Sequence, residues 1–499
     1  MAFNPVDAVV SFFNPQAGLR RAAARQVLQR AYEGASRRDG WKPRRAGASA
    51  NTDHRADAAE LRSRARALVQ NCPYITRGVG SMVANVVGTG IMPRSTAKAA
   101  TKLNALWAQW CSVADADGVR DLWGLQAAAY RAMEVDGEVL LRLRARRTSD
   151  GLPVPLQVQL LEIDMLDTFK TGSNGPNTII NGIEYDPLGK RVAYWLWDVH
   201  PGETGLIRGS RTASKPVPAE RVIHLFNPER PGQGRGITRL APVISRARDL
   251  QVYEDAEAQR KNMESRLAVL ASGDVNMIGP LSQNDDRTPD ERAATGNLGT
   301  LAGGQIIETP PGLNFTTVQP NAAPGYTEYV RLQLHLIAAG MGVTYEMLTG
   351  DVSEVNFSSA RVGMLEYRRN AEQLQWHTLI PMLCAPLWRA FVDAAYLAGA
   401  ITTVDYSVAW STPKWSYVNP VQDVAADLDE VSGGLCSLSE KIRQRGYVPD
   451  EVYAEIKADF ERLQKDGTLD FLLLLQRGRT VAMSQVQATQ PNQSAKAQK

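Results

Sequence analysis

The chain of 499 residues has few cysteines, and none of them forms a recognisable pair. Zinc sites and disulfide frameworks require cysteines at short, characteristic spacings. The cysteines of this sequence lie far apart, so neither kind of site is expected, and reduced thiols in a cytosolic setting are predicted. They are Cys72, Cys111, Cys384 and Cys436.

An excess of charge of either sign is also missing. Lysine and arginine number 56 and aspartate and glutamate 53, so the formal net charge is +3. This balance excludes a histone-like polycation, and any role with nucleic acid has to come from local charge or from geometry. Long apolar runs are missing too, because the longest candidate, residues 376–403, is interrupted by His377, Arg389, Asp393 and two prolines. No membrane span is therefore predicted.

The sequence has no motif that carries catalysis or holds a cofactor. Gly189-Lys190 lacks the preceding glycine loop of a nucleotide-binding site and predicts a hairpin turn. Asp115-Ala-Asp117-Gly118 begins like a calcium loop, but its twelfth position is Gln126, where a glutamate is needed. Gly232-Gln-Gly-Arg-Gly236 lacks dinucleotide spacing and indicates a chain reversal before a helix. We therefore expect no metal, no cofactor and no enzyme. The histidines, unpaired at helical spacing, are His54, His200, His224, His335 and His377.

Periodicity predicts helices around a mostly antiparallel β region at 138–227. Residues 138–146 alternate leucine with arginine, which is typical of a strand. A helix predicted at 238–270 would be about 50 Å long. Its middle is polar, so it is either solvated or packed against copies of itself. A turn-rich insertion and a second helix, 326–339, follow it and indicate a stalk with a tip.

The rest of the chain is predicted to be mainly helical. Residues 345–357 read as a polar loop, and a helix from 358 to about 398 should kink or break at Pro381 and Pro386. A short strand, 401–410, precedes three helices. Their start signals are Asn419-Pro420, the capping box at Ser437-Leu-Ser-Glu440, and Pro449.

Two alternatives remain open from these patterns. An enzyme would need polar groups that converge only in three dimensions. A regulator that binds duplex DNA would use the basic arm, residues 19–45, and the C-terminal helices, and would bind in a strongly salt-dependent way.

Three stretches resemble the lambda-type portal proteins of tailed bacteriophages, which are head–tail connectors. Val343-Thr-Tyr-Glu-Met-Leu-Thr-Gly-Asp-Val-Ser-Glu-Val-Asn-Phe-Ser-Ser-Ala-Arg361, continuing to Glu366-Tyr-Arg-Arg369, resembles the central signature of that family. Gly232–Gly236 with Leu240-Ala-Pro-Val243 is similar to the segment entering the family's stem, and Ala31–Trp41 to its N-terminal stretch. The likeness covers about residues 30 to 465. It departs from the family at Trp415–Pro420, where Asn419 replaces an aspartate that caps equally well.

The resemblance implies an α+β portal fold, with a mixed or antiparallel β wing, a long helical stem, a small clip insertion and a helical crown. The implied parts are a basic N-terminal arm 1–50, a wing 51–237, stem helices 238–270 and 323–342, a clip 271–322, a tunnel loop 343–357, a long helix with the remainder of the wing 358–418, a crown 419–480 and a disordered tail 481–499.

The resemblance also implies a function and its partners. Such proteins form a homo-oligomeric ring, usually a dodecamer, at one capsid vertex of the virion, and they assemble in the cytoplasm of the bacterial host. Terminase drives double-stranded DNA through the ring without sequence specificity, and the DNA later leaves into the tail. The implied protein partners are the terminase large subunit, head–tail connector proteins, and the major capsid and scaffold proteins, with no membrane involved.

Two groups of residues are candidates for the DNA channel on this reading. Acidic side chains facing phosphate would let DNA slide, whereas lysine or arginine would bind it. The stem candidates are Glu254, Asp255, Glu257 and Glu264. The tunnel-loop candidates are Asp351, Ser353, Glu354, Val355 and Asn356, for which a simple solvated loop is the alternative.

Overall fold

The computed structural model describes residues 49–203, 213–265, 268–272, 314–318, 325–353, 357–413, 415 and 420–468. Nearly all of the predicted arm 1–50, most of the insertion 271–322, the cap Asn419 and the tail 481–499 lie outside these residues. The chain divides into two units, Met1–Ala56 and Asp57–Lys499. The described part of the first unit is the beginning of helix α3 (Ala50–Asn71), and the following paragraphs concern the second unit.

The main hydrophobic core lies between helices and one face of a three-stranded sheet. At its centre four aromatic rings pack with centroids 4.9–5.7 Å apart: Trp107 and Trp110 from α5, and Trp388 and Phe391 from α12. Because each such ring buries a large apolar area, this cluster holds helices from distant parts of the chain together. The rings join α5 (Ala100–Cys111) to α12 (Ala385–Leu397), and α4 (Pro73–Val86) and α6 (Leu122–Asp136) also contribute side chains to the core.

The predicted antiparallel β region is confirmed. The three-stranded sheet has the order β3-β2-β9, with β2 (Glu138–Ala145), β3 (Leu156–Leu161) and β9 (Val222–Phe226). Alternate residues of β2 face the main core, as its leucine–arginine alternation predicts. A second, five-stranded antiparallel sheet consists of β4 (Gly172–Asn174), β5 (Asn177–Ile180), β6 (Ile183–Tyr185), β7 (Arg191–Leu196) and β8 (Lys215–Pro218).

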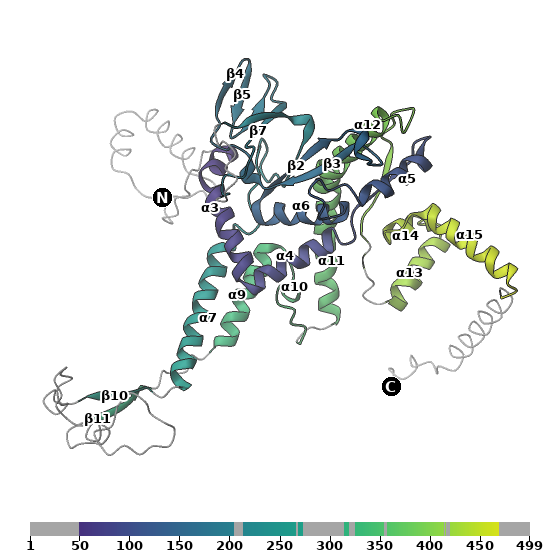
Figure 1. Ribbon diagram of the computed structural model, residues 1–499. Coiled ribbons are helices and arrows are strands. Elements are labelled where there is room, and N and C mark those ends of the chain that lie inside the picture. Colours follow the sequence, from purple (N-terminus) through teal and green to yellow (C-terminus); the bar gives the residue numbers. More distant parts are fainter. Residues whose placement is uncertain are drawn as a thin grey trace, which may run out of the picture. The chain divides into compact units, whose positions relative to one another are not determined.

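The predicted long helix is shorter than expected at both ends. Helix α7 spans Ile244–Ser265 and lies beside α9 (Tyr326–Met341) (Figure 1). Residues 239–243 form turns instead, and Pro242 has no amide hydrogen for a helical bond. Residues 268–272 form strand β10 (Ala268–Ser272), which pairs with β11 (Asn314–Val318), so long-range pairing overrides helical propensity there.

One further prediction is wrong in part, and another, a kink or break at Pro381, corresponds to a change of helix type and not to a break. The predicted polar loop 345–357 begins with a short helix, α10 (Tyr345–Thr349), whose first turn is capped by the Thr344 hydroxyl accepting from the Met347 amide at 3.3 Å. The following helix does not break at Pro381: α11 (Phe357–Leu374) continues through a π-helical segment, Gln375–Cys384, into α12. The wider π turns accommodate a residue that lacks an amide donor.

The helical stretch Ala360–Leu397 meets the length and the hydropathy that a membrane-spanning helix requires. However, 56% of the most apolar window is buried inside the protein. Leu379, Leu383 and Leu387 of this stretch belong to the main core, which is typical of the central helix of a globular domain.

The C-terminal helices follow their predicted start signals. They are α13 (Pro420–Ser432), α14 (Leu438–Gln444) and α15 (Pro449–Lys465). The Ser437 hydroxyl accepts a hydrogen bond from the Glu440 amide at 3.1 Å, which is one half of the predicted capping box, while the Glu440 carboxylate pairs with Arg443. The expected strand 401–410 is confined to β12 (Val408–Ser411), which pairs with β1 (Met92–Ser95).

Candidate channel and subunit-contact surfaces

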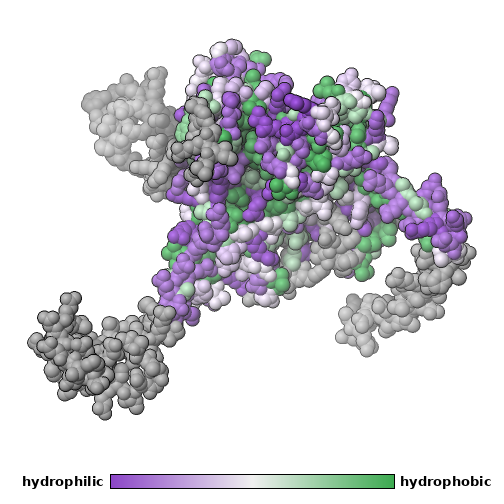
Figure 2. Space-filling view, in the orientation of Figure 1, coloured by the Kyte–Doolittle hydropathy of each residue, from purple (hydrophilic) through white to green (hydrophobic). Residues whose placement is uncertain are grey.

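Helices α7 and α9 contact each other through aromatic and polar side chains. The ring of Tyr253 stacks on Tyr326 with centroids 5.8 Å apart and meets Tyr329 edge-on at 4.8 Å. Nearer the body of the protein, Arg246 donates to Gln333 with 2.6 Å between Nη1 and Oε1. The two predicted stalk helices therefore form an antiparallel pair held by defined contacts. Figure 2 shows a mostly hydrophilic surface toward the end of this pair that leads to β10 and β11.

The candidate channel acids on α7 differ in solvent exposure and in their hydrogen-bond partners. Glu254 is half-buried and accepts a hydrogen bond from the Tyr74 hydroxyl at 3.2 Å; burial, with the charge of Asp255, raises its pKa. Glu257 is buried and binds Arg260 at 2.8 and 2.5 Å, which lowers the pKa of that carboxyl. Asp255 is exposed. The Glu264 side chain lies outside the described residues, so Asp255 is the exposed acid among the candidates whose side chains the structure describes.

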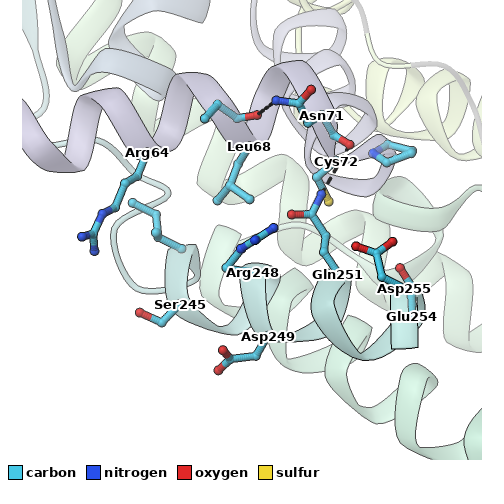
Figure 3. Close-up of a pocket in the computed structure, with 13 residues that line it drawn as sticks. Arg64, Leu68, Asn71, Cys72, Ser245, Arg248, Asp249, Gln251, Glu254 and Asp255 are labelled. Atoms are coloured by element: carbon cyan, nitrogen blue, oxygen red, sulfur yellow. Dashed lines mark hydrogen bonds between the residues drawn. The ribbon is translucent and has the colours of Figure 1, made fainter. Parts of the chain in front are cut away.

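A groove of about 780 Å³ separates the corner of α3 and α4 from the first turns of α7 (Figure 3). Arg64 lies at one end of it, and Glu254 and Asp255 lie at the other, with Arg248 between them. Gln251 bridges its floor by donating to the Asn71 carbonyl at 3.3 Å. Both charged and apolar side chains line this groove, with Leu68, Pro73 and Ile244 among the apolar ones.

An apolar stripe is exposed on α9. Tyr329, Leu332 and Leu336 recur at helical spacing and are 42%, 56% and 42% exposed, and Val252 of α7 is 50% exposed. Residues at three- and four-residue intervals share one helix face. Tyr329 also contacts Tyr253 of α7, and about half of each of these side chains remains exposed in the single chain. Grouped apolar side chains with this exposure are a candidate surface for contact with another protein. The sequence predicted a helix here but not which of its faces is covered.

The described part of the tunnel loop is short and exposed. The Asp351 carboxylate accepts from the Ser353 amide at 3.0 Å, and this hydrogen bonding lowers the pKa of Asp351. Both side chains are in contact with solvent. The base of the loop is anchored by α10, whose Met347 carbonyl accepts from the Ser81 hydroxyl at 3.1 Å. Glu354, Val355 and Asn356 lie outside the described residues.

A buried ionic network lies where the chain leaves the β sheet for the stalk. The Glu138 carboxylate is fully buried and accepts from Arg235 at 2.7 and 2.6 Å. It also accepts from the Gly236 amide and from His224 Nε2, both at 3.0 Å. Arg191 can only donate, so its contact with His224 Nδ1 at 3.1 Å leaves the ring proton on Nε2. Burial lowers the pKa of His224 to about 4, and the ring is neutral in this network.

The same junction is a close contact between two backbones. A side chain at Gly236 would place its Cβ 2.0 Å from the carbonyl oxygen of Gly137, and one at Gly137 would meet the backbone of Ile237 at 2.5 Å. Gly137 also has a φ of +90°. The glycine cluster 232–236 is thus a chain reversal, as predicted, and its glycines permit the approach that buries Arg235. Sequence reasoning missed Arg235 and Glu138 because 97 residues separate them.

A second buried carboxyl, Glu134 of α6, lies beside Arg239, with 3.7 Å between Oε2 and Nε. Arg239 also donates to the Met341 carbonyl at 2.9 Å, which ties the entrance of α7 to the end of α9. The hydroxyl-bearing rings of Tyr130 and Tyr367 are buried next to this carboxyl. Burial raises the pKa of Glu134 to about 7, against the field of Arg239.

Replacing Glu134 by glutamine is expected to change how stability depends on pH. The folded protein keeps a proton on Glu134 that the unfolded chain releases between about pH 4.5 and 7, so the stability this group contributes at low pH is lost as the pH rises to 7. Relative to the native chain, the free energy of unfolding of Glu134→Gln should rise by on the order of 2–4 kcal/mol as the pH increases across that interval. Urea unfolding at pH 5 and pH 8 measures the gain. The same difference at both pH values would contradict the expectation, and Glu60→Gln, at an exposed site, is the control.

Residues 34–375 match the family described as phage portal protein, lambda family. The match spans more than half of the chain, and the chain therefore belongs to the lambda family of phage portal proteins. The α+β fold agrees with the expectation from the sequence. The family does not favour the alternative of a DNA-binding regulator.

Two curated relatives illustrate the range of similarity. The chain is 25% identical over 343 residues to a probable portal protein of Halomonas phage phiHAP-1, an alignment that covers 66% of this chain and 64% of that protein. It is 26% identical over 208 residues to portal protein B of Escherichia phage lambda, covering 37% of this chain and 38% of that protein. The chain thus spans less than two thirds of the length of these relatives.

Solved structures show a more distant likeness. A chain in the neck of a native GTA particle, computed with C12 symmetry, matches 79% of this chain and 94% of its own length with a TM-score of 0.44 and 14% identity. The HK97 family phage portal protein from Corynebacterium diphtheriae matches 67% of this chain and 93% of its own length, with a TM-score of 0.36 and 14% identity.

Proposed function

We propose that copies of this chain assemble into a ring, a dodecamer by analogy with the family, whose central channel passes double-stranded DNA into the capsid during packaging and out into the tail during ejection. The observation that carries the proposal is the half-exposed apolar stripe of α9, Tyr329, Leu332 and Leu336. A stripe of this kind on an antiparallel helix pair is stabilised when the same pair of a neighbouring copy covers it. The charged groove between α3 and α7 supplies a second face for the neighbour.

The role of the channel is physical and requires no catalysis. Asp255 is exposed on α7, and an acidic channel wall repels the phosphate backbone, so DNA slides without being held. Glu254 and Glu257 already have partners within the chain, Tyr74 and Arg260. We therefore assign the surface along which DNA slides chiefly to Asp255. Glu254 and Glu257 have structural roles.

The partners proposed are those of a portal vertex. The clip, residues 271–322, would contact the terminase large subunit during packaging and the head–tail connector proteins afterwards. The wing would contact the major capsid and scaffold proteins, in a virion assembled in the host cytoplasm. Family membership supports these assignments.

Negative-stain electron microscopy of the purified protein tests the ring directly. Rings with a central hole of about 20 Å or more, the width of a duplex, are expected. Small uniform particles, both alone and after addition of the phage's scaffold protein, would contradict the proposal.

The tunnel loop gives a second test of the channel. Replacement of residues 351–356 by a neutral Gly/Ser linker of the same length should lower DNA packaging or retention severalfold without dissolving the rings, because the loop is exposed and its anchor α10 is untouched. Packaged DNA protected from nuclease is the measurement. Packaging at the native level in ring-forming particles would remove the loop from the mechanism.

A further inference from the structure

The outer face of strands β2 and β3 carries a row of arginines. Arg142 and Arg144 project from one side of β2, because alternate residues of a strand share a face, and Arg146 follows one residue past the end of the strand. Leu141 and Leu143 project to the other side and pack in the main core. The row is therefore fixed to a rigid strand whose opposite face is buried. Figure 2 shows a strongly hydrophilic surface over this part of the molecule.

The partners that orient these arginines are neutral. Arg144 donates from Nε at 2.9 Å and from Nη2 at 2.6 Å to Oε1 of Gln159, and Arg146 donates from Nε at 2.8 Å to Oε1 of Gln157. Gln157 is itself anchored through its amide nitrogen to the Val113 carbonyl at 2.9 Å. Glutamine positions a guanidinium without neutralising it, and the guanidinium keeps further N–H groups for a ligand.

Within the described part of the chain, the row makes no direct ion pair, although the Asp117 carboxylate accepts from the amide nitrogen of Gln159, the partner of Arg144, at 3.5 Å. Among the residues that the structure describes, no carboxylate lies within the 4.0 Å ion-pair distance of Arg142, Arg144 or Arg146. Burial and the fields of Arg144 and Arg221 lower the pKa of Arg142, against the field of Asp198. The Asp198 carboxylate, however, is bound to Lys215 at 2.6 Å. Like charges held together in this way are stabilised by an anion from outside the chain.

We propose that Arg142, Arg144 and Arg146, with Gln157 and Gln159, bind the phosphate backbone of double-stranded DNA on the surface of the β wing, at a site distinct from the channel. Side chains at every second strand position repeat at about 6.6–6.8 Å. A regular row of this kind suits a polymer with a regularly repeated charge, whereas the carboxylates of an acidic protein follow no fixed repeat. Arginine and glutamine are both common phosphate contacts. The site holds DNA, in contrast to the acidic channel, which lets it slide.

Fluorescence anisotropy with a labelled 30-base-pair duplex tests the site on the full-length protein. Each phosphate contact contributes about 0.9 to the slope of log affinity against log salt. The variant R142Q/R144Q/R146Q should therefore reduce that slope by about 2.7 per bound subunit and weaken binding at least tenfold at low salt. The matched control R443Q/K457Q/R462Q removes the same charge from exposed cations that pair with Glu440, Glu461 and Asp459 and that lie outside the groove between α3 and α7. It should change binding much less.

Three results would contradict the binding of DNA by this row of arginines. Equal losses in the triple variant and the control would overturn it. So would a triple variant that still binds duplex but no longer binds polyglutamate, since the face would then recognise an acidic protein. R142K/R144K/R146K retains the charge should the glutamine variant fail to fold, and it should retain the salt slope; loss of the slope there also overturns the site. Ring formation is scored separately by microscopy, so failure of the proposed channel function is distinguishable.

Discussion

The double replacement Leu332→Asp and Leu336→Asp is expected to abolish ring assembly and leave single chains of 54.6 kDa. The two leucines are about half exposed in the single chain, so covering each one in an interface contributes about half of the 1.5–3 kcal/mol that full burial of a leucine contributes. Losing both weakens each subunit contact by about 1.5–3 kcal/mol, which is roughly a tenfold to hundredfold loss of affinity at every contact of the ring. The aspartates add repulsion between neighbouring copies. Size-exclusion chromatography with light scattering measures the mass.

The control for this experiment is Leu188→Asp. Leu188 is 94% exposed in the turn between β6 and β7, away from the helix pair. Its replacement should leave assembly unchanged. Rings of native mass in the Leu332/Leu336 variant would place the ring contact elsewhere on the chain.

Glu138→Ala should destabilise the folded chain by about 3–5 kcal/mol. The change leaves Arg235, which is 2% exposed, buried without its counter-charge, and it removes the acceptor of His224 and of the Gly236 amide. Burying an unpaired guanidinium costs far more than the pair itself contributes to stability. Urea unfolding followed by circular dichroism measures the loss. Since the network joins β2 to the entrance of α7, the stalk should also become more sensitive to proteolysis.

Two variants separate the unpaired charge from a general packing defect. Glu138→Gln combined with Arg235→Met removes both charges, keeps a side-chain acceptor for the Gly236 amide, and should recover most of the lost stability. Glu60→Ala removes one partner of an exposed ion pair with Arg64 and should cost less than about 1 kcal/mol. A double variant as unstable as Glu138→Ala alone would show that the ion pair is not the cause.

Local signals in the sequence predicted local structure well. The alternation in 138–146 gave β2 its two faces, and Ser437 capped a helix because the capping box needs only residues three apart. Predictions failed where distant residues decide the outcome. Residues 268–272 leave the predicted helix because they pair with 314–318, and Pro381 is tolerated inside a π-helical segment that the core packs around.

For the candidate channel residues, too, the sequence predicted the local pattern but not the contacts with distant residues. The acidic pattern of α7 is visible in the sequence, but only the structure shows that Tyr74 and Arg260 engage Glu254 and Glu257 and leave Asp255 exposed. The buried pair of Glu138 and Arg235 has no sequence signal beyond an arginine between two glycines. The helical spacing of Leu332 and Leu336 is readable, yet whether a helix face is covered depends on the tertiary structure.

The contact between Gly137 and Gly236 has a consequence for how sequences of this kind can change. Each position excludes a side chain because the backbone of the opposing segment already occupies the space, 2.5 and 2.0 Å from where a methyl carbon would lie. A substitution at one site cannot be compensated by a smaller residue at the other, because glycine has no side chain that could be made smaller. In a saturation mutagenesis library, we expect neither Gly137 nor Gly236 to tolerate any substitution, including alanine. Positions in the surface loop around Gly232 should tolerate many more.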